Sequence, residues 1–246
     1  SNDVRQMNRQ RVLSTVRRDG PSSRTDIGAR TGLSAATVSA ITSDLLSEGV
    51  LLRQSSKVNV GAEKSGTGRG RPQVALAINP SAAMVCAVYC QLNFVSASMF
   101  DYAGSLISEY TIEISINNIT PAEIKQSLIS CIEGALDRTG LDETALRRIE
   151  LGFQGVTDVQ GAHILWTPIC AQTDMPIKQW LEDHFGVAAH VANDCDMIAQ
   201  ALNRRDPVKY GENFATILLA HGVGMGLFLR GAMINGTRSS GVEFGH

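Results

Sequence analysis

Apolar residues recur at helical spacing in three successive stretches of the first fifty positions. The first predicted helix covers residues 7–16, and Gly20-Pro21 ends it. Its apolar side is formed by Met7, Val12, Leu13 and Val16. A second helix follows either Ser22 or Ser23 as N-cap, and Gly32 supplies a turn residue able to adopt a positive φ. The chain is therefore expected to begin with a small group of packed helices.

The third stretch predicts a helix from about Ala35 to Glu48, with Ser34 as its N-cap. Its apolar positions are Val38, Ile41, Leu45 and Leu46, and its opposite face carries Ala35, Ala36, Thr37, Ser39, Ala40 and Ser43. Small side chains let a helix approach the major groove of DNA, where hydroxyl groups donate hydrogen bonds to phosphates or base edges. The pattern predicts a helix-turn-helix, with an ordinary three-helix packing unit as the alternative. The residues expected at DNA are Arg24, Ser34, Ala35, Thr37 and Ser39.

Two strand-like runs follow the third helix, at residues 50–52 and 74–78. The segment between them is rich in Gly, Ser, Lys and Asn, which is typical of the wing of a winged helix-turn-helix. Within it, Gly68-Arg69-Gly70-Arg71-Pro72 resembles the AT-hook. The guanidinium groups of Arg69 and Arg71 would lie along a narrow, A·T-rich minor groove, with a plain linker as the alternative.

From residue 76 onward, strand-like and helix-like runs alternate, which indicates an α/β fold. Strands are expected at 84–89, 94–100, 105–116, 149–153, 188–191 and 214–220, and helices at 120–139, 177–185 and 192–203. Thr120-Pro121 opens the first of these helices with an N-cap and a proline at the first helical position.

The composition is that of a folded protein with a substantial core. Hydrophobic residues make up 43% of the 246 positions and charged residues 19%. No apolar run is long enough to span a membrane and no secretory leader is present, so a cytoplasmic location without a membrane partner is expected. The five cysteines are scattered through apolar context, which favours buried thiols over disulfides.

Charge divides the chain into two parts. Residues 1–75 hold 12 Lys and Arg against 6 Asp and Glu, whereas the remainder holds 10 against 18. Neutralising phosphates requires local positive charge, so a basic N-terminal segment on an acidic body is typical of a DNA-binding module attached to a domain that does not bind DNA.

Four short motifs occur in order along the body: L-W-T-P at 165–168, A-N-D-C-D at 192–196, A-H-G-V-G-M-G at 220–226 and G-V-E-F-G-H at 241–246. Behind a winged helix with G-R-G-R-P, this order resembles the ROK family of repressors, open reading frames and sugar kinases, and within it the repressors of sugar uptake and of amino-sugar or xylose use. The resemblance implies a winged helix-turn-helix at 1–75. It also implies an actin-like, sugar-kinase-type ATPase fold of two lobes, the first at 76–193 and the start of the second at 194–246.

In this family the sugar lies in the cleft between the lobes. The resemblance implies that Asn193, Asp194, Glu243 and His246 contact its hydroxyls, with Gly155 and Thr167 lining the cleft. Carboxylates, amides and imidazole suit hydroxyls that both donate and accept hydrogen bonds. Asp194 matches the catalytic base of the kinases. A helix N-cap is the alternative role for Asn193-Asp194, and both roles are compatible.

Two departures from the kinase pattern change the expectation. The kinases cradle the phosphates of ATP with Asp-x-Gly-x-Thr, but the corresponding stretch here is Tyr89-Cys90-Gln91-Leu92-Asn93. A second turn, Gly-Thr-Gly in the kinases, is Ala220-His221-Gly222 here, and Gly222, Gly224 and Gly226 are compatible with a structural turn. Phosphoryl transfer depends on positioning and charge stabilisation, so the body is expected to be a sensor with no catalytic residues rather than an enzyme.

A third departure concerns zinc. In the family the His of Glu-x-Gly-His is a zinc ligand followed by a cysteine cluster, whereas this sequence ends at His246. One imidazole cannot form a four-ligand structural zinc site. Either the fold is truncated at its C-terminus, with zinc bound through His246 only in a longer protein, or the protein lacks the zinc site.

Together these features predict a repressor of carbohydrate genes that binds double-stranded operator DNA as a homodimer or a dimer of dimers. A sugar effector would shift the lobes and so change the spacing of two recognition helices, which must lie about 34–36 Å apart to read half-sites. Asp194 favours one alternative, a sugar kinase with a fused DNA-binding domain. A repressor whose body binds a phosphotransferase-system protein is the other.

Overall fold

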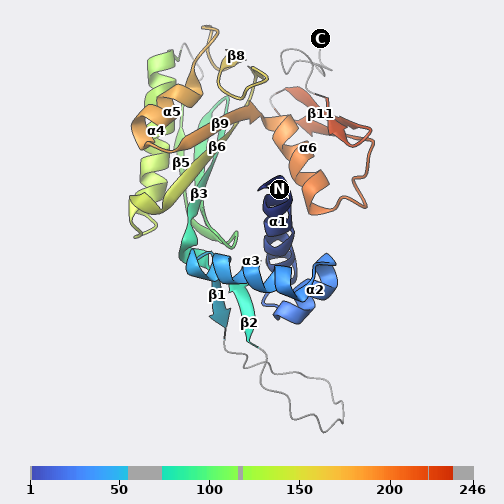
Figure 1. Ribbon diagram of the computed structural model, residues 1–246. Helices are drawn as coiled ribbons and strands as arrows, with labels where there is room; N and C mark the ends of the chain where they lie inside the picture. Colours follow the sequence, from blue (N-terminus) through green and yellow to red (C-terminus); the bar gives the residue numbers. More distant parts are fainter. Residues whose placement is uncertain (1, 55–73, 116–118, 221, 235–246) are drawn as a thin grey trace, which may run out of the picture. The chain divides into compact units, whose positions relative to one another are not determined.

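The computed structural model describes residues 2–54, 74–115, 119–220 and 222–234 (Figure 1). They divide into two compact units. The N-terminal unit comprises the chain as far as Ala82 together with Asp101–Ser105, and the C-terminal unit comprises Ala83–Phe100 and the chain from Leu106 onward.

The N-terminal unit packs three helices on a two-stranded antiparallel sheet. Its elements are α1 (Asn2–Asp19), α2 (Arg24–Thr31), α3 (Ala35–Ser47), β1 (Leu51–Gln54), β2 (Ala75–Ile78) and the 3-10 helix η1 (Pro80–Ala82). Its buried core consists of Val12, Val16, Ile27, Val38, Ile41, Leu45, Leu51, Leu76 and Ile78. Met7 is the exception to the predicted apolar side of α1, because it is 51% exposed.

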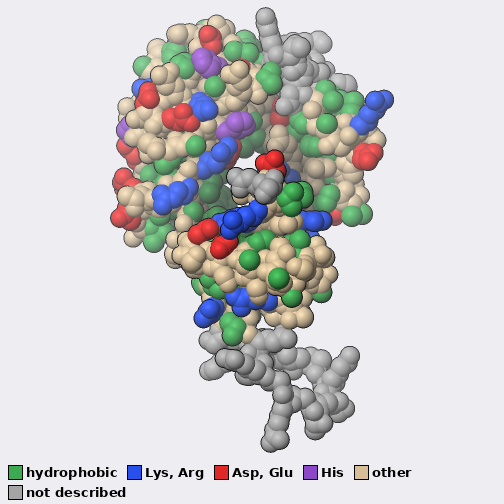
Figure 2. Space-filling model, viewed as in Figure 1, with side chains coloured by type: hydrophobic (Ala, Val, Ile, Leu, Met, Phe, Trp, Pro, Cys, Tyr) green, Lys and Arg blue, Asp and Glu red, His purple; other side chains and the backbone are tan. Residues whose placement is uncertain are grey.

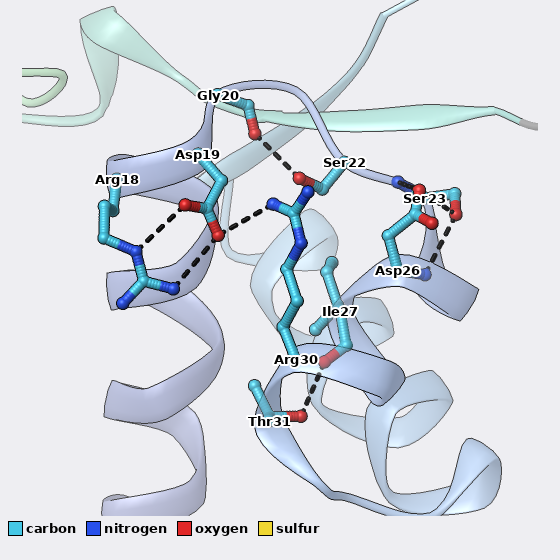
Figure 3. A network of polar contacts seen from close by, with 9 residues as sticks. All are labelled: Arg18, Asp19, Gly20, Ser22, Ser23, Asp26, Ile27, Arg30 and Thr31. Atoms are coloured by element: carbon cyan, nitrogen blue, oxygen red, sulfur yellow. Dashed lines mark hydrogen bonds and ion pairs between the residues drawn. The ribbon is translucent and has the colours of Figure 1, made fainter.

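Polar contacts fix the turn between α1 and α2 (Figure 3). Ser23 accepts a hydrogen bond from the backbone N–H of Asp26 at 3.1 Å, and the Asp26 carboxylate accepts one from the backbone N–H of Ser23. Ser23 is therefore the N-cap of α2. Ser22 instead donates its hydroxyl to the carbonyl of Gly20 at 3.0 Å.

The carboxylate of Asp19, the last residue of α1, accepts hydrogen bonds from Arg18 and lies 2.8 Å from a guanidinium nitrogen of Arg30 on α2. The hydrogen bonds from Arg18, with that from Arg30, lower the pKa of Asp19 to about 2. A lowered pKa in the folded state contributes stability above the unfolded-state pKa, near 4, and that contribution is lost as the pH falls toward 2.

We therefore expect Asp19→Asn to lower the melting temperature of the protein at pH 7 and to have little effect near pH 2, where the wild-type carboxylate is itself becoming protonated. Thermal melts of both proteins across this range measure the effect. An equal difference in melting temperature at pH 7 and pH 2 would show that the ion pairs contribute nothing.

The C-terminal unit is built on a five-stranded sheet of order β5-β4-β3-β6-β9. Its strands are β3 (Met84–Gln91), β4 (Phe94–Asp101), β5 (Leu106–Glu113), β6 (Leu146–Phe153) and β9 (Ala188–Asn193). β3, β6 and β9 are parallel, and β4 and β5 form an antiparallel hairpin. Helices α4 (Pro121–Asp137) and α5 (Ile177–Phe185) pack against this sheet and each other on one side (Figure 1).

A second group of elements follows the sheet. Helix α6 (Asp194–Arg205) packs on a three-stranded sheet of β10 (Phe214–Leu219), β11 (Val223–Leu229) and β12 (Ala232–Met233). The short pair β7 (Val156–Thr157) and β8 (Ile164–Trp166) and the 3-10 helix η2 (Glu143–Ala145) complete the described elements. The α/β prediction is confirmed, whereas β7, β8, β11 and β12 were not predicted.

The cysteines are buried, as expected. Burial raises the pKa of Cys86 to about 12 and also raises that of Cys90, so these thiols stay protonated. In the described part of the chain, no helix is both long and apolar enough to span a membrane.

The turn of the β4–β5 hairpin, Asp101–Ser105, belongs to the N-terminal unit although both strands lie in the C-terminal unit. Tyr102 packs against the N-terminal core and donates its backbone N–H to the carbonyl of Pro80 at 3.1 Å. The guanidinium of Arg17 lies 5.1 Å from the centre of the Tyr102 ring and donates to the Tyr102 carbonyl at 3.1 Å. The chain therefore passes between the two units three times.

Candidate functional site

Helix α3 presents a face of small, exposed side chains. Ser34 caps the helix by accepting from the backbone N–H of Thr37 at 3.2 Å, and the two hydroxyls are 2.8 Å apart. Ser34, Ala35 and Ser39 are exposed and Thr37 is half-buried. The structure thus places four of the residues predicted at DNA together on or beside this face.

Arg24 has an additional structural role. Its Nε donates to the hydroxyl of Thr42 at 2.8 Å, and Thr42 is fully buried within α3. The Thr42 hydroxyl in turn donates to the carbonyl of Val38 at 2.8 Å. Arg24 therefore positions the start of α2 against the middle of α3.

The acidic residues of α3 gather at its C-terminal end and are paired there. Arg5 of α1 lies 2.6 Å from the carboxylate of Asp44, and Arg9 forms an ion pair with Glu48. Over α3 the space-filling view shows hydrophobic and other uncharged surface, with acidic and basic side chains gathered at one end (Figure 2). These ion pairs join α1 to α3 and neutralise charges that would repel DNA.

A cavity of about 290 Å³ opens in the C-terminal unit. Cys90, Phe153 and Asn193 occupy matching register positions at the ends of the parallel strands β3, β6 and β9. The residues that follow them therefore emerge at one edge of the sheet, where ligands of such folds usually bind. The cavity is lined from this edge by Gln91, Leu92, Gln154, Gly155, Asn193, Asp194 and Cys195, from β8 and its loop by Trp166 and Pro168, and from β10 and β11 by Leu218, Ala220, Gly222, Val223 and Gly224.

Asn193 caps α6, so the N-cap role weighed from the sequence is confirmed. Its Oδ1 accepts from the backbone N–H groups of Cys195 at 2.9 Å and Asp196 at 3.2 Å. Its Nδ2 donates to the carbonyl of Gly155 at 2.8 Å. The side chain thus holds the start of α6 against the loop after β6 while lining the cavity.

Asp194 is buried beside the cavity, only 5% exposed. Burial raises its pKa, although its carboxylate accepts a hydrogen bond from the Cys195 backbone N–H at 2.9 Å. Asp196 is also buried, and burial, followed by the charge of Asp194, raises its pKa to about 6. Two carboxylates that are costly to ionise thus lie in the first turn of α6.

The loop of Gly155 is tightly built. Its φ is 149°, and a Cβ there would lie 2.2 Å from the carbonyl oxygen of Trp166, so only glycine fits. Thr167, expected to line the cleft, is buried; its hydroxyl donates to the Gln154 carbonyl at 2.8 Å and accepts from the Ile169 N–H. Thr167 therefore supports the cavity wall, and Trp166 is the neighbour that lines it.

Residues 89–93 correspond to the phosphate-binding motif of the kinases, and their side chains form hydrogen bonds of their own. The hydroxyl of Tyr89 donates to the Asp194 carboxylate at 3.4 Å and accepts from the amide of Gln91. Burial raises the pKa of Tyr89 to about 12, so it remains a donor. Asn93 leaves its buried Oδ1 without a hydrogen-bond donor among the described residues. These residues were recognised only as departures from the kinase pattern, without a role.

Gly224 and Gly226 lie inside β11, which corrects their interpretation as turn residues. A Cβ at Gly224 would lie 2.3 Å from the sulfur of Cys195, and one at Gly226 would lie 2.5 Å from the Cys195 carbonyl oxygen. The absence of side chains therefore allows β11 to approach α6 closely.

Four predicted site residues, Arg69, Arg71, Glu243 and His246, lie outside the described residues. Among the described ones, no group of three or more His, Cys, Asp or Glu side chains is arranged to hold a metal ion.

Known proteins share both parts of this architecture. The family model "Winged helix-turn-helix DNA-binding" matches residues 8–51, and the model "ROK family" matches residues 98–246. The xylose repressor of Bacillus spizizenii is 24% identical over 243 residues, which cover 99% of this chain and 60% of that protein. The chain thus spans about three fifths of the length of this curated relative.

Two solved structures share the fold. A ROK family transcriptional regulator described as a homolog of the E. coli MLC protein superposes with a TM-score of 0.71 at 21% identity, covering 96% of this chain and 57% of that one. A ROK family glucokinase from Streptomyces griseus, solved with glucose and AMPPNP, superposes with a TM-score of 0.56 at 22% identity, covering 67% and 50%. Because the ROK model matches more than half of its residues, the chain belongs to the ROK family.

Proposed function

We propose that the chain is the DNA-binding and effector-sensing part of a sugar-responsive transcriptional repressor. The winged helix-turn-helix match and the name of the xylose repressor support the DNA-binding part. The observation that carries the sensing part is the cavity, which is lined by Asn193, Asp194 and Gln154 together with Gln91, a residue of the stretch that stands in place of a phosphate cradle.

Sugar sensing requires groups that both donate and accept hydrogen bonds in a partly apolar cavity. Asp194 supplies acceptors and Asn193 a further amide hydrogen, while Trp166 and Leu218 supply apolar surface. Glu243 and His246 remain proposed contacts to the same sugar, and zinc in a longer protein remains a proposal that involves His246.

Asp194 favours a second candidate function, a sugar kinase, because it matches the catalytic base. The residues present do not fit the phosphates of ATP: Gln91 stands where the cradle needs glycine, Asn93 where it needs threonine, and Tyr89 in place of its aspartate. Turnover of ATP with glucose or N-acetylglucosamine distinguishes the two functions, and we expect none.

The experiment that tests the proposal is calorimetry of the full-length protein against a panel of pentoses, hexoses and amino sugars, together with operator binding. Binding of a sugar that changes the affinity for operator DNA supports it. A folded protein that binds none of these sugars would overturn the sensing part. Binding of a phosphotransferase-system protein, without binding of any sugar, would show that a protein rather than a sugar is the signal.

We expect Arg69→Ala with Arg71→Ala to weaken operator binding and to flatten its salt dependence, because two phosphate-proximal charges in the minor groove are removed. The slope of log affinity against log salt should fall in magnitude by about one for each lost charge contact. An unchanged slope would exclude a contact between the wing and DNA.

A further inference from the structure

A fully buried threonine of α3 holds the guanidinium of Arg24, the first residue of α2. The Thr42 hydroxyl donates its single hydrogen to the carbonyl of Val38 at 2.8 Å, so its oxygen acts as an acceptor toward α2. The Nε–H of Arg24 donates to that oxygen at 2.8 Å. This hydrogen bond fixes the orientation of the guanidinium but does not use the N–H groups of its two Nη atoms.

The place of Thr42 on α3 brings this guanidinium to the border of the small-residue face. Residues three and four apart are neighbours on a helix, so Thr42 lies one turn after the exposed Ser39 and the buried Val38. The Thr42 hydroxyl oxygen is 3.2 Å from the carbonyl oxygen of Ser39. Arg24, itself half-buried, therefore reaches α3 where its core side meets the face that we expect at DNA.

The charge of Arg24 also differs from that of several other arginines in the same unit. Arg5 pairs with Asp44, Arg9 with Glu48 and Arg30 with Asp19. Within the described ranges of the chain, the guanidinium of Arg24 forms no ion pair and only the hydrogen bond to Thr42. The two Nη groups of an arginine match two oxygens of one phosphate, and DNA phosphates flank a helix that lies in the major groove.

We propose that Thr42 is a positioning residue for DNA binding, an inference that rests on the DNA-binding function proposed above. By holding Nε, Thr42 directs the Nη groups of Arg24 toward one phosphate of the DNA backbone beside α3. An arginine that is already held loses less conformational freedom on binding than a mobile one, so the contact raises the affinity. A buried side chain that does not touch DNA thus contributes to DNA binding through its neighbour.

The test measures the affinity of the full-length protein for a labelled duplex across a series of salt concentrations. The duplex is one that the wild-type protein selects from a pool of random-sequence DNA. We expect Arg24→Ala to weaken binding by about tenfold and to lower the magnitude of the slope of log affinity against log salt by about one. An unchanged slope would show that Arg24 contacts no phosphate and would overturn the proposal.

Thr42→Val keeps the shape of the side chain but removes the acceptor for Arg24. We expect it to weaken binding severalfold, to move the slope toward that of Arg24→Ala, and to have no further effect in a protein that already carries Arg24→Ala. Thr42→Ser retains the hydroxyl and should restore both the affinity and the slope. Thr15→Val is the control, because Thr15 is a buried threonine of α1 in the same unit, and we expect wild-type binding.

Thermal melts verify that each variant is folded at the temperature of the binding assay, and Thr42→Ala replaces Thr42→Val if the latter is not. Equal affinities and slopes of wild type and Thr42→Val would overturn the inference and leave DNA binding intact. Additive losses in the double variant would also overturn it, because Thr42 would then act independently of Arg24. Failure of folded wild-type protein to select any duplex would overturn the DNA-binding function itself.

Discussion

Gly226→Ala will destabilise the C-terminal unit by about 1–3 kcal/mol, whereas Gly222→Ala will be tolerated. A Cβ at Gly226 would lie 2.5 Å from the carbonyl oxygen of Cys195 and 2.8 Å from the Cβ of Ala199. Both belong to α6, and one is backbone, so neither can move aside without shifting the helix. At Gly222 the nearest atom would be the Gln154 amide nitrogen at 3.9 Å, an ordinary contact.

Chemical denaturation of the two variants and the wild type measures the difference in the free energy of unfolding. Glycine to alanine in an unhindered strand is normally stabilising, by roughly 0.5–1 kcal/mol, so a loss at Gly226 identifies steric conflict. Because α6 begins at the cavity residue Asp194, we also expect weaker effector binding by Gly226→Ala. Equal stabilities of the two variants would mean that the contact between β11 and α6 is looser than described.

Ser39→Glu will weaken operator binding by roughly ten- to a hundredfold without unfolding the N-terminal unit. Ser39 lies exposed on the small-residue face of α3, and glutamate is a good helix former, so the helix itself should persist. The new carboxylate would meet phosphates and base edges at close range, and the loss of one such contact position costs about 1–3 kcal/mol. Titration of labelled operator DNA measures the affinity.

Ser14→Glu is the matched control for Ser39→Glu, because Ser14 is exposed on α1 and the same substitution adds the same charge to the same unit. We expect near-wild-type operator binding by this variant at physiological salt. Equal weakening by the two substitutions would indicate a general charge effect and would argue against α3 as the recognition helix.

The sequence pattern predicted the helices of the N-terminal unit because their apolar residues repeat at helical spacing and their caps are explicit. Ser23, Ser34 and Thr120 all cap the helices that follow them. The parallel strands were also predictable as short apolar runs between turn residues. The exposure of Met7 could not be predicted. Helical periodicity places Met7 on the apolar side of α1, but the buried core residues of this helix begin only at Val12.

The cavity could be predicted only in part. Asn193, Asp194 and Gly155 follow from motifs, but Gln91, Gln154 and Trp166 are brought to them by strand register and a loop, which local patterns do not encode. Gly224 and Gly226 show the same limit. Their spacing suggested a turn, whereas the contact with Cys195 that requires glycine there joins β11 to a helix almost thirty residues earlier in the chain.

The hairpin turn that belongs to the N-terminal unit means that this unit is discontinuous in sequence. A recombinant fragment ending at Ala82 would contain all three helices and both strands of the winged helix but would lack Tyr102. Its core would lose the covering ring, and Arg17 would lose both its aromatic and its carbonyl partner. DNA-binding studies on such a fragment would therefore describe a less stable domain than the one in the intact chain, and grafting the module onto another sensor would require a replacement for the tip of the hairpin.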